Sequence, residues 1–241
     1  MKPYWSFFKL IYKAHIETKV FFGFCFLFTA VSIYFLHSHL GIINRDYISW
    51  VDEVIAPVVG NIHFLMILFS PAFIYLIFSN FFNEESRYLC KFLRLDYKYC
   101  FFVNYFVGLL MSCLLLSIFI PLSFYLETLG FSDLFYLYHS LFIILLLTSV
   151  FCSMSVYILS WTKNPLLYLS FYLLGVSYFY LIGLLSNYVE NYVLVSVLRY
   201  LSFAVLFDDT LSGVLSFKKI IYLLSLNLFF LSLVVFRNTS I

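Results

Sequence analysis

The side chains most able to bind or react gather in one short stretch, NEESRYLCKFLRLDYK, residues 83–98. The 241-residue chain has 14 basic and 12 acidic residues, and this stretch holds more than a quarter of them: Glu84, Glu85, Arg87, Lys91, Arg94, Asp96 and Lys98. The four bases recur at helical spacing, so a helix would align them as one stripe, with Leu89, Phe92 and Leu93 on another side. The stretch is therefore predicted to be an amphipathic helix. Its basic stripe could rest on anionic lipid or could dock a protein partner.

The paired acids also raise the question of an intramembrane peptidase. Glu84 and Glu85 near a basic residue, with a separate F-x-x-x-H from Phe135 to His139, resemble the prenyl-protein protease type. The first motif of that family is E-E-x-x-x-R, whereas here Arg87 follows after a single residue. The topology predicted below also places Glu85 and His139 at opposite membrane surfaces, where they could not share a metal or a water. An intramembrane protease is therefore a less favoured alternative.

The remaining nucleophiles and potential ligands form no recognisable catalytic set. The five cysteines are odd in number, include no C-x-x-C pair and are interpreted as small apolar residues. The pair His37-x-His39 follows the first apolar run, and its spacing is compatible with ordinary interfacial histidines or with a metal site. The sequence has no G-x-x-x-x-G-K-[ST], G-x-G-x-x-G or H-E-x-x-H motif. We expect no catalytic residue, cofactor or metal in this chain.

The composition is that of a membrane protein. Apolar residues make up 64% of the chain, charged residues 11%, and the mean hydropathy is +1.00, whereas a soluble domain is about half apolar and a quarter charged. The net charge of +2 provides no basic surface for nucleic acid. The 32 phenylalanines and 21 tyrosines could line a path for an apolar or sugar-like cargo, or could reflect compositional bias alone.

Crossing the hydrocarbon layer takes roughly 20 apolar residues. Six uncharged runs qualify or nearly qualify: about 20–37, 57–81, 100–125, 137–161, 165–187 and 220–236. The first run is interpreted as an anchor rather than a signal peptide, because no small-x-small cleavage site follows it. Arg199 aside, no membrane-buried acid or base is expected in spans two to six, which argues against proton- or sodium-coupled transport. Residues 1–241 are therefore predicted to form one all-α transmembrane domain.

The distribution of basic residues predicts that both termini are cytoplasmic. With the N-terminus inside, ten lysines and arginines fall on the inner side, and the outer side has only Arg45, Arg199, Lys218 and Lys219. Such an excess marks the cytoplasmic side of a membrane protein. We expect a multi-pass protein of a bacterial cytoplasmic (inner) membrane.

Two further segments are expected to lie along the membrane surface. In residues 1–19, the apolar residues recur at helical spacing on one face, and Lys2, Lys9 and Lys13 lie on the opposite face. This pattern is typical of an interfacial helix and also of a plain basic anchor. Residues 190–217 are expected to form a half-immersed outer-leaflet segment. Its stretch 191–207 could instead be a seventh span, but Arg199 at its centre would cost about 2.5–3.5 kcal/mol on insertion.

This layout resembles the export-class (type-2) permease subunits of ATP-binding-cassette transporters. Its short branch, linked to gliding motility and copper-enzyme maturation, is the most similar in length. Two stretches carry the resemblance: PAFIYLIFSNFFNEESR, residues 71–87, and FDDTLSGVLSFKKIIYLLSLNLFFLSL, residues 207–233. The charged cluster of such permeases usually runs into Gly-Thr and ends near a proline, both of which are missing here.

The resemblance implies a mechanism and a set of partners. Two permease chains, identical or related, would form a pathway in the lipid bilayer, and a separate ABC ATPase subunit, carrying ATP and Mg, would dock on the cytoplasmic coupling helix at 83–98. Glu84, Glu85 and Arg87 would contact or position that ATPase, with Arg94 and Lys98 as secondary contacts. The expected function is an ATP-driven export permease without its own ATPase, and the alternative is a non-transport membrane assembly factor or anchor.

Overall fold

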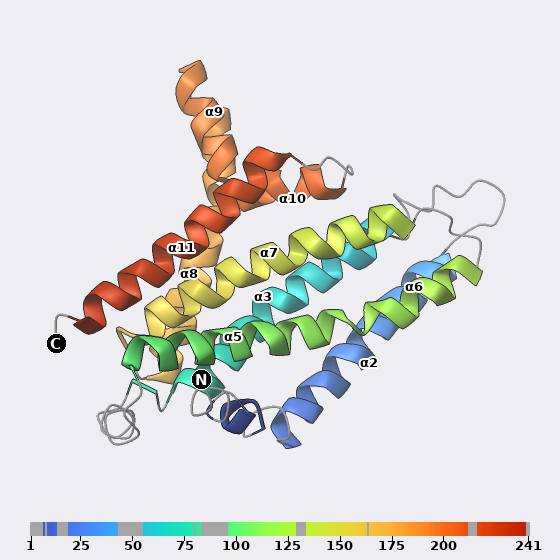
Figure 1. Cartoon of the computed structure of the whole chain (residues 1–241). Helices are drawn as coiled ribbons and strands as arrows, with labels where there is room; N and C mark the ends of the chain where they lie inside the picture. Colours follow the sequence, from blue (N-terminus) through green and yellow to red (C-terminus); the bar gives the residue numbers. More distant parts are fainter. Residues whose placement is uncertain are drawn as a thin grey trace.

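The computed structural model describes residues 7, 9–13, 19–42, 55–79, 81–82, 96–128, 134–162, 164–211 and 216–239, which are almost entirely helical and include no strand (Figure 1). Nine α-helices have both of their ends in these ranges: α2 (Lys19–Ile42), α3 (Ala56–Phe78), α5 (Tyr97–Leu116), α6 (Phe119–Thr128), α7 (Leu134–Leu159), α8 (Pro165–Leu185), α9 (Tyr192–Leu201), α10 (Phe203–Leu211) and α11 (Phe217–Thr239). A 3-10 turn, Ser186–Tyr188, follows α8.

Six of these segments are long and apolar enough to cross a membrane, as predicted: α2, α3, α5 continued by α6, α7, α8 and α11. The third breaks between α5 and α6, where the Ser117 hydroxyl donates to the Leu114 carbonyl at 2.7 Å. Asp96 caps the start of α5 by accepting from the Lys98 backbone N–H at 3.0 Å, and Asn164 caps α8 in the same way just before Pro165. The chain is a multi-pass helical membrane protein.

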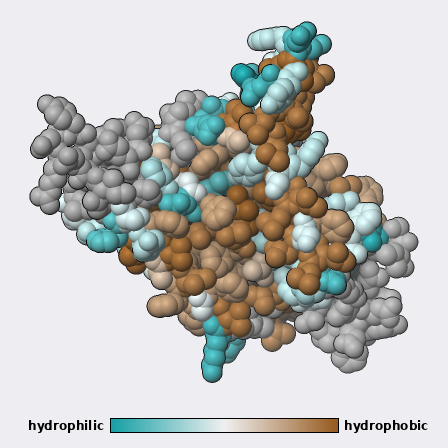
Figure 2. Space-filling view, turned by 180° about the vertical axis from the view of Figure 1, so that it is seen from behind, coloured by the Kyte–Doolittle hydropathy of each residue, from teal (hydrophilic) through white to brown (hydrophobic). Residues whose placement is uncertain are grey.

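The two most buried spans form the centre of the bundle. In both α3 and α7, 67% of the residues in the apolar window are buried, against 22% in α2 and in α8. Helix α7 contacts α3, α5, α6, α8, α10 and α11, while α2, α8 and α11 turn large apolar side chains outward. Figure 2 shows apolar surface across much of the face seen from behind. In a bilayer this surface lies against lipid or another apolar protein surface.

The proline inside α3 is accommodated by tyrosines of α8. Pro71 has no N–H to donate to the carbonyl of Ile67, four residues earlier. The Tyr172 hydroxyl supplies the missing donor at 2.9 Å from Ile67 O and lies 3.0 Å from Ser70 Oγ. The Tyr168 hydroxyl donates to the Pro71 carbonyl at 2.9 Å. Because no water reaches the hydrocarbon region, this pairing is what makes the proline tolerable there.

A second buried polar contact joins three spans. The Tyr105 hydroxyl of α5 lies 3.0 Å from the Ser149 carbonyl oxygen of α7 and 3.0 Å from Asn227 Oδ1 of α11. Asn227 Nδ2 donates to Ser149 Oγ at 2.8 Å. Interhelical hydrogen bonds of this kind add to van der Waals packing in holding membrane helices together.

The segment between the fifth and sixth spans is two short helices. Helix α9 has ten residues and α10 has nine, about 15 Å or less each, so neither can cross about 30 Å of hydrocarbon. The break between them is at Ser202, whose backbone is extended and whose carbonyl accepts from the Leu206 N–H at 3.1 Å. The alternative of a continuous seventh helix over 191–207 is therefore wrong. Helix α9 projects away from the bundle beside the end of α8, while α10 lies across the bundle (Figure 1).

The predicted interfacial helix at 1–19 is described only in part. Residues 9–13 are helical. Ile11 and Tyr12 pack against the main core, whereas Lys9 and Lys13 are exposed. These residues have the two-sided pattern expected of that segment.

The ends of the spans alternate between the two ends of the bundle. The start of α2 and the ends of α3, α7 and α11 lie at one end of the bundle, and the end of α2 and the starts of α7 and α11 lie at the opposite end (Figure 1). Exposed Lys98, at the start of α5, and exposed Glu190, after the turn that follows α8, therefore mark opposite ends.

Chemical labelling of single cysteines tests this arrangement. In a background without native cysteines, we expect Glu190→Cys to react with a membrane-impermeant maleimide in intact cells. Lys98→Cys should react only after permeabilisation, because the basic ends of a membrane protein face the cytoplasm. Labelling is read as a mass shift on a gel. Equal labelling of both variants in intact cells would contradict the arrangement, and the reversed pattern would invert the expected orientation.

Candidate functional site

Most of the sequence-predicted contact residues lie outside the described part of the chain. These are Glu84, Glu85, Arg87 and Arg94. Lys98 is described: it lies in the first turn of α5 with an exposed side chain. The end of α3 and the start of α5, on either side of residues 83–95, lie at the same end of the bundle as the end of α11 (Figure 1). His139, near the start of α7, belongs to the opposite end, as the argument against a shared peptidase site requires.

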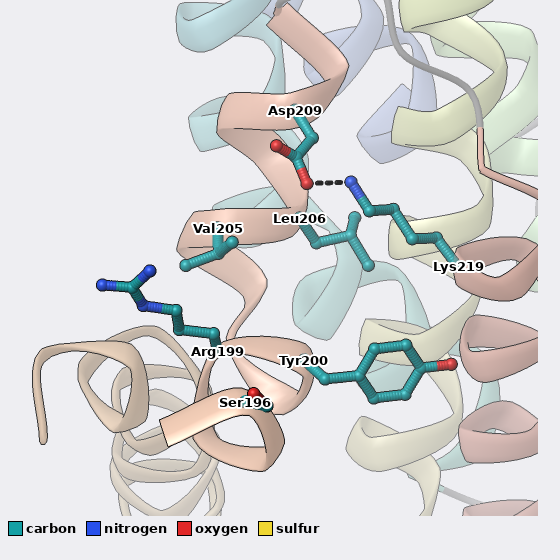
Figure 3. Close-up of a pocket in the computed structure, with 7 residues that line it drawn as sticks. All are labelled: Ser196, Arg199, Tyr200, Val205, Leu206, Asp209 and Lys219. Atoms are coloured by element: carbon teal, nitrogen blue, oxygen red, sulfur yellow. Dashed lines mark hydrogen bonds and ion pairs between the residues drawn. The ribbon is translucent and has the colours of Figure 1, made fainter. Parts of the chain in front are cut away.

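A pocket of about 210 Å³ opens between α9, α10 and the start of α11 (Figure 3). Helix α9 lines it with Ser196, Arg199 and Tyr200. Helix α10 contributes Val205, Leu206 and Asp209, and α11 contributes Lys219. The pocket thus has apolar side chains in its middle and formal charges at its edges.

The walls of this pocket are held by local hydrogen bonds. Asn191 caps the start of α9 by accepting from the backbone N–H groups of Val193 and Leu194 at 3.0 and 3.3 Å. At the other end of α9, the Tyr200 hydroxyl donates to the Lys218 carbonyl at 2.9 Å. The Tyr222 hydroxyl donates to the Leu201 carbonyl at 3.1 Å, and the rings of Tyr200 and Tyr222 lie 5.0 Å apart. These contacts tie α9 to α11 across the pocket.

The charges of the pocket are unequally matched. The Lys219 ammonium forms an ion pair with the Asp209 carboxylate. Arg199 extends to the other side of the pocket, away from that pair (Figure 3). Its Nε donates to Ser186 Oγ at 3.4 Å, and no carboxylate of the described residues pairs with it. The pocket therefore keeps one positive charge that the described protein does not neutralise.

A buried histidine was missed by the sequence interpretation. His63 lies in α3 with 4% of its side chain exposed, and its Nε2 is hydrogen-bonded to the Tyr180 hydroxyl of α8. Its ring stacks on Phe207 of α10, with 4.3 Å between centroids. His139 of α7 is also buried. The expectation that spans two to six contain no buried base apart from Arg199 is therefore wrong, and Arg199 itself is exposed in α9.

The sequence signal for His63 was available: a titratable residue at the centre of an uncharged run is expensive in a membrane and usually has a role there. Here the imidazole connects α3 to α8 and α10, and its neighbours are aromatic rather than acidic. That surrounding fits a packing contact better than a path for protons.

No group of three or more potential metal ligands occurs among the described residues. Of the sequence-noted pair, His37 is exposed at the end of α2, and the side chain of His39 lies outside the described set. No protein-family model, curated protein or solved structure matches the chain. The candidate site must therefore be interpreted from its own geometry and charge.

Proposed function

We propose that this protein is the permease subunit of an ATP-driven exporter, energised by a separate ATPase that docks on residues 83–98. The observation that supports it most is the helical insertion between the fifth and sixth spans. Helices α9 and α10 lie between α8 and α11, and α10 buries Phe203 and Leu206 in the bundle. The resemblance to export-class permeases led us to expect a half-immersed segment at this place in the chain, and two short helices are compatible with it.

The placement of charge also supports an external source of energy. Within the six spans, charged side chains occur only in the terminal turns: Lys19, Lys98, Glu127, Lys218, Lys219 and Arg237. A transporter coupled to an ion gradient usually has a charged or titratable group that faces a water-filled path at mid-membrane depth. His63 is a titratable group within a span, but it is packed among aromatic rings.

Charge reversal in the proposed coupling helix tests the function. The chain is expressed with a candidate P-loop ATPase that co-purifies with the wild-type chain. It is compared as wild type and as the triple variant Glu84→Lys, Glu85→Lys, Arg87→Glu. We expect the variant to recover about tenfold less ATPase in detergent-solubilised membranes, because losing an interfacial charge pair costs at least about 1.4 kcal/mol. The ATPase is quantified by immunoblot against the permease.

A matched control separates coupling from general damage. Glu190→Lys changes an exposed acid at the opposite end of the bundle and should leave ATPase recovery unchanged. Equal recovery from the wild type and the triple variant would remove the coupling role of 83–98. If no nucleotide-binding subunit ever co-purifies with the wild-type chain, the alternative of a membrane assembly factor or anchor is favoured.

A further inference from the structure

The length and composition of α11 lead us to expect the pocket beside Arg199 at the depth of lipid headgroups. Lys219 occupies the first turn of α11, the sixth span, which is apolar from there to Arg237 at its other end. A span of this length fills the hydrocarbon layer, so its charged first turn marks the membrane boundary. Tyr200, which is hydrogen-bonded to the Lys218 carbonyl, belongs to the residue type enriched at that boundary.

The lining of the pocket suits an amphiphile rather than a water-soluble ion. Val205 and Leu206 form its middle, and large side chains of α9 outside the pocket, such as Val193 and Val197, are exposed and apolar. A lipid could lay its upper chain along such a surface. A free anion would gain nothing from it.

The charge of the pocket selects the headgroup. Asp209 is neutralised by Lys219, whereas the Arg199 guanidinium has no carboxylate partner among the described residues. A guanidinium presents paired N–H donors that match phosphate oxygens. Arg199 also extends away from Asp209 (Figure 3), so a phosphate beside it would avoid the repulsion of that carboxylate.

From this combination we propose that the pocket between α9, α10 and α11 binds the phosphate headgroup of a membrane lipid, with Arg199 as its principal contact. The site does not depend on the proposed ATPase partner. Its lipid would anchor the projecting helix α9 and the crossing helix α10 at the membrane surface.

The test uses the full chain in non-ionic detergent and native mass spectrometry. Dioleoyl-phosphatidylglycerol is titrated in, with dioleoylglycerol, which has the same tails and no phosphate, as the comparison lipid. We expect the phospholipid to bind and dioleoylglycerol to bind weakly or not at all. Arg199→Gln should weaken phospholipid binding about tenfold, the loss expected for one charge-assisted hydrogen-bonded contact.

Lys218→Gln is the matched control, because it removes the same charge one residue from Lys219 without altering the pocket lining. It should change binding less than twofold. Ser196→Phe fills the pocket while keeping Arg199, and should weaken binding as Arg199→Gln does. Unchanged thermal unfolding midpoints check that the variants are folded. Arg199→Lys keeps the positive charge and should therefore bind the phospholipid more tightly than Arg199→Gln.

Three outcomes would overturn the proposal. Unchanged binding in Arg199→Gln would exclude the contact. Equal losses in Arg199→Gln and Lys218→Gln would show general attraction between a basic protein end and an anionic lipid. Displacement of the phospholipid by inorganic phosphate at equal concentration would assign the site to a free phosphate compound instead of a lipid.

Discussion

Gly183→Val is expected to destabilise the protein by about 1–3 kcal/mol, the usual cost of overpacking a close contact. A Cβ atom at Gly183 would collide with Ser202 Oγ and lie 2.8 Å from Ser202 Cβ. Ser202 cannot move away easily, because its backbone forms the break between α9 and α10 and its carbonyl accepts the Leu206 N–H. The larger side chain should therefore push the end of α8 away from this break.

Unfolding of the purified protein by sodium dodecyl sulfate, followed by circular dichroism, measures this effect. Gly60→Val is the control, since nothing lies within 4 Å of a Cβ atom at Gly60 in α3. Both variants place a β-branched residue in a helix, so their difference isolates the clash. Ser202→Gly should restore part of the stability lost in Gly183→Val. Equal losses at the two glycine positions would contradict a close approach at Gly183.

Tyr172→Phe is expected to cost about 1–2 kcal/mol, because it leaves the Ile67 carbonyl, which Pro71 already deprives of its helical donor, without a partner in the bundle core. In a membrane the unsatisfied carbonyl cannot turn to water. The Ser70 hydroxyl, 3.0 Å from the tyrosine oxygen, also loses a partner. Tyr178→Phe, at an exposed position of the same helix, should cost close to nothing.

A double-mutant cycle with Pro71→Ala makes the prediction specific to the carbonyl. Alanine at that position restores an N–H donor within α3, so Tyr172→Phe should cost less in the Pro71→Ala background than in the wild type. The same detergent unfolding measurement gives all four free energies. If the cost of Tyr172→Phe is the same in both backgrounds, the tyrosine hydroxyl does not compensate the proline.

The sequence shows Pro71 and Gly183, but it does not show the residues that contact them. Pro71 is visible in the sequence as a proline within an apolar run, and a kink or a compensating donor could be anticipated from it. The identity of the donor could not be anticipated, because Tyr172 lies 101 positions further along the chain and shares its run with three other tyrosines. Likewise, Gly183 resembles every other glycine of the spans until Ser202 is placed against it.

For the candidate pocket too, the sequence shows the charged residue and the tertiary structure shows its neighbours. Arg199 was noticed in the sequence as a charge in an apolar stretch. The two interpretations of residues 191–207 were a seventh span and a half-immersed surface segment. Tertiary structure placed the bend at Ser202 and brought Lys219 of α11 beside Asp209 of α10. Periodicity could not have shown this, because α10 and α11 meet through side chains rather than through a repeated pattern.

The sequence by itself determined the class of the protein, the number of its spans and the approximate residues of each. The reason is local: an uncharged run of about 20 residues can satisfy its backbone in lipid only as a helix. Tertiary structure alone decided the pairing of Tyr172 with the proline-freed carbonyl, the burial of His63 against Phe207, and the charge left over at Arg199. These contacts depend on which helix faces meet. Because the apolar spans have similar compositions, the packing of individual side chains determines which faces meet.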